Sequence, residues 1–226
     1  MLQRFARGVL HLLGWRIEYV EPPGPRGIII VYPHTSNWDF VIGLLAKWAI
    51  GLPLRFIGKE SLFRGFTGAT LGRLMRLWGG RPVDRHRASG AVEQLAQLMR
   101  SEPWFWLALS PEGTRKFQDH LRSGFYHLAL AMHVPVGLAF IDYGRKSVGV
   151  RDYVRMSGDV AADLQLLRDF YADRQGLYPE KAASITAKNS SRGAGQMYPA
   201  VTATVRTPLV RHACATSIAY SMNTVG

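Results

Sequence analysis

The chain has 226 residues, a length that suits one α/β domain, and its 47% hydrophobic residues exclude a largely disordered protein. It carries 28 Lys and Arg against 16 Asp and Glu, and the net charge of +12 favours an anionic partner such as nucleic acid, acidic lipid or a phosphorylated ligand. The single cysteine, Cys214, excludes an intramolecular disulfide and a cysteine-based zinc site.

Residues 2–17 are predicted to form a basic amphipathic helix, and we assign residues 1–20 to this segment. Its apolar side chains share one face, and its basic side chains fall largely elsewhere. Such a helix can lie in a membrane interface or pack on the domain as an ordinary terminal helix, and the pattern favours neither. The apolar face consists of Leu2, Phe5, Val9, Leu12 and Leu13, and the basic residues are Arg4, Arg7 and His11.

The chain is not predicted to cross a membrane, because no apolar stretch reaches the roughly 18 residues that a span needs. The longest candidates are interrupted, one by Lys47 and Pro53 and the other by His133 and Pro135. The N-terminal segment also lacks the small-residue cleavage site of a secretory signal. We therefore expect the protein to stay in the cytoplasm.

Strands and helices are predicted to alternate from residue 28 onward. A buried strand at 28–32 is followed by a helical pattern that Ser36 or Asn37 caps. The alternation predicts an α/β fold with a mostly parallel central sheet flanked by helices, in a domain spanning residues 25–180. Residues 181–226 contain no acidic residue and no periodicity, so we expect a loosely ordered basic tail. The other expected strands are 54–58, 104–110 and 135–142, and the other expected helices are 67–78, 88–101, 123–132 and 160–175.

Two polar segments, "HTSNWD" at 34–39 and "SPEGTR" at 110–115, come directly after predicted strands. Ligands of parallel sheets gather at the carboxyl ends of the strands. We therefore expect the two segments to share one edge of the sheet and to face a common crevice.

His34 and Asp39 are too far apart around one continuous helix to meet, so a pair between them requires a turn. With His34 on that turn and Asp39 in the first helical turn, the carboxylate can reach one imidazole nitrogen and leave the other as a proton acceptor. The nucleophile would then be a substrate hydroxyl, since the chain has no GxSxG elbow. The alternative is a loop histidine beside a helix-capping acid.

The other charged segments each allow two interpretations. In "SPEGTR", Gly113 permits a tight turn from which Glu112 and Arg115 can reach one ligand, and a guanidinium there can bind a phosphate; the alternative is a surface turn with a Glu–Arg ion pair. Residues 56–85 mix apolar side chains with arginines, with Lys59 after a strand and Arg85 at the end. They form either a packed helix with solvated arginines or a surface for an anionic lipid.

In this order and spacing, the segments resemble the lysophospholipid acyltransferase family, which includes bacterial 1-acyl-glycerol-3-phosphate acyltransferases, over roughly residues 25–180. "HTSNWD" is similar to the family's first motif, HxxxxD. "GGRPVDR" is similar to the second, whose arginine helps to hold the acceptor phosphate. "SPEGTR" is similar to the third motif, and "VPVGLAF", with Pro135, to the fourth.

The resemblance implies transfer of a fatty acyl group from acyl-CoA or acyl carrier protein to the hydroxyl of a lysophospholipid, 1-acyl-glycerol-3-phosphate above all, in phospholipid synthesis. His34 would be the general base and Asp39 would orient it. It implies no metal and no cofactor beyond the acyl donor, no nucleic-acid partner, and a peripheral position on an anionic membrane, at the inner face of the cell membrane. The implied substrate-binding residues are Lys59, Arg85, Glu112, Gly113, Thr114 and Arg115.

Two other functions compete with acyl transfer. A metal-dependent hydrolase would use His34 and Asp39 as ligands, but the sequence has no HExxH motif and no second dense His/Asp cluster. A non-enzymatic basic protein would bind membranes or nucleic acid through its net charge, but its arginines are dispersed and no RNP-like or zinc-finger pattern is present.

Overall fold

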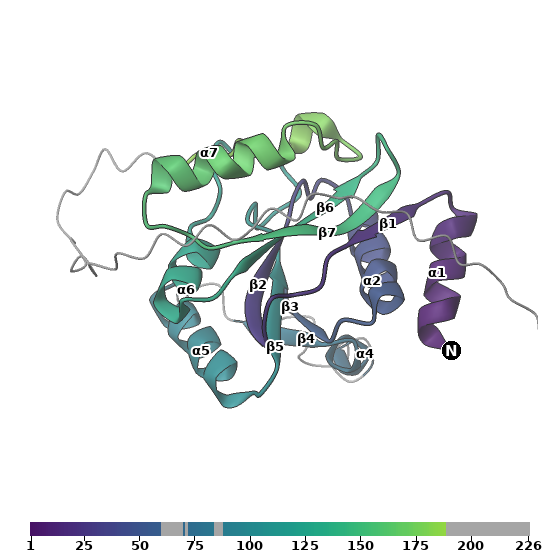
Figure 1. Ribbon diagram of the computed structural model, residues 1–226, viewed down its shortest axis with the longest axis horizontal. Helices are drawn as coiled ribbons and strands as arrows, with labels where there is room; N and C mark the ends of the chain where they lie inside the picture. Colours follow the sequence, from purple (N-terminus) through teal and green to yellow (C-terminus); the bar gives the residue numbers. More distant parts are fainter. Residues whose placement is uncertain (60–69, 71, 84–87, 189–226) are drawn as a thin grey trace, which may run out of the picture. The chain divides into compact units, whose positions relative to one another are not determined.

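The computed structural model describes residues 1–59, 70, 72–83 and 88–188, and a seven-stranded sheet forms the centre of this part of the chain (Figure 1). The strand order is β1-β7-β6-β2-β5-β3-β4, and all neighbours pair in parallel except β6 and β7. The predicted fold, a mostly parallel sheet flanked by helices, is confirmed. The strands are β1 (Arg16–Tyr19), β2 (Arg26–Val31), β3 (Leu54–Lys59), β4 (Gly80–Val83), β5 (Phe105–Leu109), β6 (Val136–Asp142) and β7 (Ser147–Val154).

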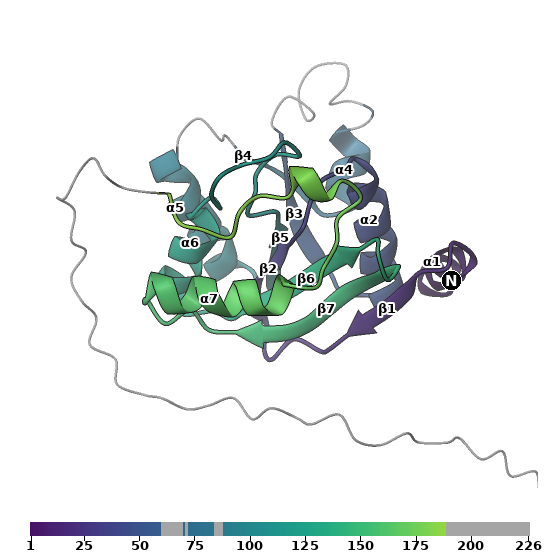
Figure 2. The same cartoon turned by 90° about the horizontal axis from the view of Figure 1, so that it is seen from above.

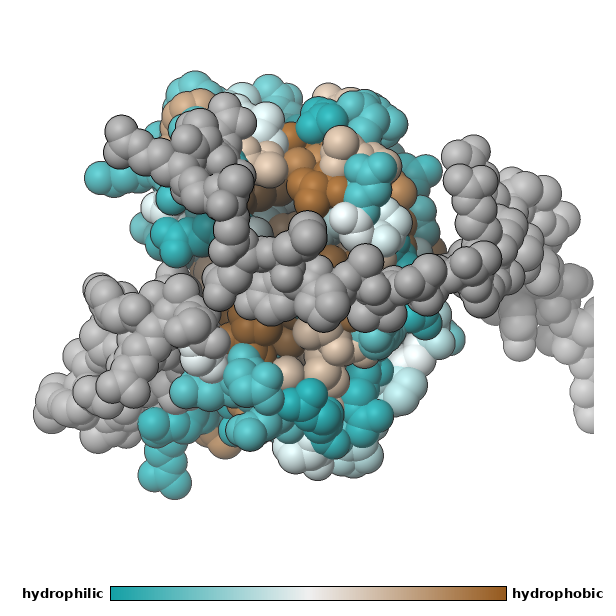
Figure 3. Space-filling view, turned by 90° about the vertical axis from the view of Figure 1, so that its left-hand side faces the viewer, coloured by the Kyte–Doolittle hydropathy of each residue, from teal (hydrophilic) through white to brown (hydrophobic). Residues whose placement is uncertain are grey.

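Helices lie on both faces of the sheet (Figure 2). One face carries α5, α6 and α7, and the other carries α2, with α1 beside it. Viewed from the side of α5, α6 and α7, hydrophilic residues surround a hydrophobic middle (Figure 3). The helices are α1 (Leu2–Leu12), α2 (Trp38–Ile50), α4 (Arg73–Leu77), α5 (Ala88–Ser101), α6 (Gly124–Met132) and α7 (Val160–Tyr171), with a short 3-10 helix, η3, at Pro179–Lys181.

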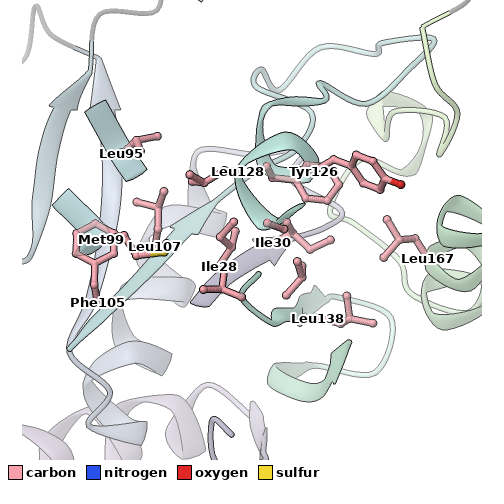
Figure 4. Close-up of a cluster of buried hydrophobic side chains, with 14 of the residues drawn as sticks. Ile28, Ile30, Leu95, Met99, Phe105, Leu107, Tyr126, Leu128, Leu138 and Leu167 are labelled. Atoms are coloured by element: carbon pink, nitrogen blue, oxygen red, sulfur yellow. The ribbon is translucent and has the colours of Figure 1, made fainter. Parts of the chain in front are cut away.

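Strand β2 is buried on both faces, which explains its uninterrupted run of isoleucines. Ile28 and Ile30 join the cluster between the sheet and α5, α6 and α7 (Figure 4), whereas Ile29 belongs to a cluster on the opposite face. Because β2 lies in the interior of the sheet, the loop that follows it is supported by neighbouring strands on both sides.

The N-terminal segment differs from its prediction in two respects. The helix ends at Leu12, not at residue 17, because Gly14 adopts the left-handed conformation (φ +76°), and Arg16–Tyr19 then forms β1 beside β7. The helix also does not bury the predicted apolar face. It packs through Ala6 and Leu10 on α2, leaving most of that face exposed.

Strands β1, β4 and β7 were not predicted, and they lie toward the two edges of the sheet. The predicted helix at 67–78 is shorter in the described part of the chain, where α4 spans only Arg73–Leu77. No helix among the described residues is long and apolar enough to span a membrane.

The prediction of a loose tail is wrong for its first residues, 181–188. Residues 181–188 are described, and they pack against the domain through Ala183, which is buried. Residues 189–226 lie outside the described part of the chain, so the prediction of a loose basic tail there stays a prediction.

Candidate active site

The loops after β2 and β5 lie side by side, because the two strands pair in parallel and Ile30 stands opposite Leu109. "HTSNWD" and "SPEGTR" therefore meet at the carboxyl edge of the sheet, as predicted. A hydrogen bond joins them: the backbone N–H of His34 donates to Glu112 Oε2 at 2.6 Å.

His34 and Asp39 form the pair that their spacing allows only across a turn. His34 Nδ1 lies 3.1 Å from Asp39 Oδ2, and Asp39 stands in the first turn of α2. The backbone N–H groups of Thr35 and Ser36 donate to the same Oδ2 at 2.7 and 2.8 Å. The Asp39 carboxylate thus folds the loop back over the start of α2 and fixes the position of the imidazole.

The start of α2 agrees with the prediction that Ser36 or Asn37 caps the helix. Asn37 precedes the helix but makes no side-chain capping bond, whereas the Ser36 hydroxyl accepts the N–H of Trp38 at 3.2 Å. The alternative of Asp39 as a mere capping acid does not fit, since its carboxylate also lies against His34.

Tyr143, which the sequence analysis missed, completes the surroundings of Asp39. Its hydroxyl donates to Asp39 Oδ1 at 2.9 Å. Burial tends to raise the pKa of Asp39, but hydrogen bonds from His34, the Ser36 N–H and Tyr143 outweigh burial and lower that pKa. Asp39 is therefore ionised at neutral pH and is suited to hold a proton on His34 Nδ1.

Glu112 is buried beneath the two loops. Its Oε2 accepts the His34 N–H, its Oε1 accepts the N–H of Ala183 at 3.0 Å, and Ser110 Oγ lies 3.4 Å from Oε2. Burial raises the pKa of Glu112 to about 7. The carboxylate binds backbone amides rather than Arg115, which is exposed, so the alternative of a Glu112–Arg115 ion pair is wrong.

An apolar cavity of about 200 Å³ lies between α2 and the sheet, and both His34 and Asp39 line it. Its walls include residues along α2 as far as Ile50 and residues from five strands. The cavity therefore reaches from the His34–Asp39 pair deep under the helix. The apolar side chains that line the cavity include Val31, Phe40, Ala46, Leu54, Ile141 and Val148.

The His34–Asp39 pair thus lies beside an apolar cavity, and comparison with known proteins decides the family. The family model described as Acyltransferase matches residues 16–137, which is more than half of the chain. The protein is a member of the acyltransferase family. It is therefore an acyltransferase enzyme, and the family named from the sequence motifs is confirmed.

Among solved structures, the acyltransferase is similar to the crystal structure of the 1-acyl-sn-glycerophosphate (LPA) acyltransferase, PlsC, from Thermotoga maritima. The TM-score is 0.46 and the sequence identity is 16%, over 76% of this chain and 74% of that chain. No curated protein matches the chain.

The third motif of the acyltransferase forms a tight turn at its glycine. Gly113 has a φ of +66°, and a Cβ at this position would collide with the side chain of Arg122. Thr114 and Arg115 follow this turn, and the Thr114 hydroxyl lies 3.4 Å from the N–H of Lys116. The structure thus brings Glu112 to His34, and Arg115 stays at the surface of the same loop.

The remaining predicted binding residues are only partly placed. Lys59 ends β3, which neighbours β5, so its backbone lies at the same edge of the sheet as the third motif. The side chain of Lys59 and the whole of Arg85 lie outside the described part of the chain. Strand β4 ends at Val83, two residues before Arg85, and Val83 pairs with Lys59.

The described residues contain no cluster of side chains suited to bind a metal ion. Within them, no group of three or more His, Cys, Asp or Glu side chains is arranged to hold a metal ion. The expectation of a metal-free reaction stays a prediction, which chelation can test.

Proposed function

We propose that this acyltransferase moves a fatty acyl group from an acyl thioester, acyl-CoA or acyl carrier protein, to the hydroxyl of a lysophospholipid in phospholipid synthesis. The acceptor we favour is 1-acyl-glycerol-3-phosphate. The observation that carries the proposal is the His34–Asp39 pair, 3.1 Å apart, at one end of an apolar cavity.

In this proposal His34 is the general base. Asp39 Oδ2 accepts a hydrogen bond from the Nδ1–H group of His34. The unprotonated Nε2 can then take the proton of the acceptor hydroxyl. The resulting oxygen nucleophile attacks the thioester carbonyl, and the departing thiolate takes the proton back from the imidazolium. The ionised, buried Asp39 stabilises that imidazolium while the tetrahedral intermediate exists.

The apolar cavity is proposed to hold the acyl chain. Lys47 lines it eight residues after Asp39, which corresponds to about 12 Å along an α-helix. The Lys47 ammonium donates to the backbone oxygen of Trp78, and burial lowers the pKa of this lysine. An apolar cavity that extends along α2 from the proposed base suits a fatty acyl chain better than a polar substrate.

The acceptor phosphate is proposed to bind at the carboxyl edge of the sheet, to Arg115, Lys59 and Arg85. Arg115 is an exposed guanidinium three residues after Glu112 in the loop that follows β5, and Lys59 lies on the adjacent strand, β3. Guanidinium groups bind phosphate through paired hydrogen bonds. The net charge of +12 supports an anionic acceptor.

We further propose that the enzyme binds the cytoplasmic surface of an anionic membrane through α1. Phe5 and Leu12 of this helix are 63% and 86% exposed, while the helix is held on α2 by Ala6 and Leu10. Arg7 contributes a hydrogen bond from Nε to the backbone oxygen of Ala49 at 2.8 Å. An apolar stripe flanked by arginines, on a helix fixed to the domain, suits a membrane interface.

The proposal is tested by thiol release from acyl-CoA and from acyl carrier protein, with lysophosphatidate, other lysolipids and no acceptor compared side by side. We expect acceptor-dependent release that His34→Ala abolishes and EDTA leaves unchanged. The matched control is His120→Ala, because His120 also contacts an aspartate, Asp119, but does not line the cavity. Acceptor-independent release, or loss of activity in EDTA, would favour the metal-dependent hydrolase instead.

A further inference from the structure

The chain continues past α7 into a segment that lies against the two catalytic loops, and we call residues 175–186 the strap. It follows the range matched by the family model, which ends at residue 137. Tyr178 N–H donates to the Thr35 hydroxyl at 3.2 Å, and Tyr143 N–H donates to the Gln175 oxygen at 2.8 Å. The strap thus touches both the residue after His34 and the residue that supports Asp39.

Ala183 is the point where the strap meets the third motif and Tyr32, which stands two residues before His34. Its N–H donates to Glu112 Oε1 at 3.0 Å, and its backbone oxygen accepts the Tyr32 hydroxyl at 2.7 Å. The second oxygen of Glu112 accepts the His34 N–H at 2.6 Å. One carboxylate therefore connects the backbone of the strap to the backbone of the catalytic histidine.

The outer half of the strap is fixed as well. Ser184 N–H donates to the Gln118 oxygen, Leu121 N–H donates to the Thr186 oxygen, and the Thr186 hydroxyl donates to the Asp119 oxygen at 2.6 Å. These bonds anchor it to the segment after the third motif. The strap is therefore bonded to the domain on both sides of its contacts with Thr35 and Glu112.

We propose that the strap positions the general base: Glu112, held by the Ala183 N–H, fixes the His34 backbone, and the Thr35 contact fixes the loop from the other side. Glu112 is then a positioning residue and not a contact of the acceptor. The inference rests on the proposed role of His34 as the base. It adds residues 175–186 to the parts of the chain that determine the rate.

Gly176 offers a selective way to disturb the strap. A Cβ at Gly176 would lie 2.7 Å from Thr35 Oγ1 and 2.9 Å from Thr35 Cγ2, so Gly176→Ala must push the strap and the loop apart. The matched control is Gly124→Ala, because a Cβ at Gly124 meets nothing within 4 Å. A second pair of variants acts on the bonds without adding an atom between the strap and the loop. Glu112→Gln keeps only one oxygen to accept the two backbone N–H groups, and Thr35→Val removes the hydroxyl that accepts the Tyr178 N–H.

We expect Gly176→Ala, Glu112→Gln and Thr35→Val each to lower kcat about tenfold or more, as for loss of a buried hydrogen bond, with KM for donor and acceptor changed less than twofold. Gly124→Ala should match the wild type. The double variant Gly176→Ala/Glu112→Gln should lose less than the product of the two single losses, because both act through one loop. Ring signals of His34 in NMR spectra should move in the three variants and stay in place in the control.

Wild-type kcat and unmoved His34 signals in Gly176→Ala and Glu112→Gln would overturn the proposal. The proposal would also be overturned if kcat fell, KM rose by the same factor and Tm fell, because this pattern indicates a general loss of folded structure. If the wild type transfers no acyl group, the proposed function fails, but the His34 signals still decide whether the strap positions that ring. If Gly176→Ala does not fold, Thr35→Val provides the same readouts.

Discussion

The Tyr143 hydroxyl donates to Asp39 Oδ1 at 2.9 Å, while His34 Nδ1 lies 3.1 Å from Oδ2 of the same carboxylate. Asp39 therefore has its two oxygens bound by side chains that lie far apart in the sequence. This arrangement makes Tyr143 a supporting residue for the proposed base, although no motif of the sequence includes it.

Replacing Tyr143 by Phe should leave Asp39 Oδ1 without its buried donor. The pKa of Asp39 should rise, and kcat should fall about tenfold, because the loss of a buried bond to a charged group costs about 1.5–3 kcal/mol. Steady-state kinetics measure this effect. Tyr153→Phe is the control, since the Tyr153 hydroxyl donates to the backbone oxygen of Val20 at 3.1 Å and not to Asp39. Equal kcat in both variants would contradict a role for Tyr143.

Glu112 should make stability depend on pH in a definite direction. Its pKa is raised by burial to about 7 in the folded protein, above the ordinary value of 4.5. The folded state thus binds the proton more tightly, so this contribution to stability is present in full below about pH 4.5 and is lost as the pH rises through 7.

The measurement is the free energy of unfolding of the wild type and of Glu112→Gln at several pH values. Relative to the variant, the wild type should gain about 3 kcal/mol between pH 7 and pH 4.5, as expected from the shift in pKa. Exposed Glu21→Gln in the same buffers serves as the control. A difference between wild type and Glu112→Gln that stays constant with pH would show that Glu112 is not buried as described.

Filling the cavity should change which acyl chains are accepted. Gly43 lies one turn after Asp39 on α2 and lines the cavity, and a Cβ there would have only Ile141 Cδ1 nearby, at 3.7 Å. A leucine at this position therefore fits the helix but occupies the cavity. Gly43→Leu should lower kcat/KM for long-chain donors about tenfold or more while short-chain donors are retained.

The check is a series of acyl-CoA donors of increasing length with wild type, Gly43→Leu and the control Gly124→Leu, whose site is open. An unchanged preference for chain length in Gly43→Leu would mean that the acyl chain binds elsewhere.

Membrane binding should depend on the exposed face of α1. Leu12→Asp and Phe5→Asp should each lower the affinity for anionic vesicles, measured by co-sedimentation, about tenfold or more. The reason is that a large apolar side chain contributes roughly 1.5–3 kcal/mol on burial. Binding by the wild type should also weaken with added salt, since basic residues attract the anionic surface. Leu166→Asp on α7 is the control, because Leu166 is an exposed leucine away from α1. The same loss in all three variants would argue against α1 as the contact.

Local sequence was sufficient for most of the fold and for the central pair. The isoleucines of β2 predict a strand buried on both faces, and the turn after it is the only geometry in which His34 and Asp39 can meet. Both patterns involve residues close in the chain, so their physical constraints are visible in a single segment. The edge strand β1 was not predicted, because its pairing partner, β7, lies far away in the sequence.

By itself, therefore, the sequence determined the parallel α/β architecture, the meeting of the first and third motifs and the presence of a histidine–carboxylate pair. Only the tertiary structure decided that Tyr143 supports Asp39, that Glu112 faces inward to two backbone amides, and that the strap reaches the loop that carries His34. The reason is that these contacts join residues separated by 71 to 143 positions. Periodicity and spacing report which face a residue occupies along its own element, but not which distant group stands opposite.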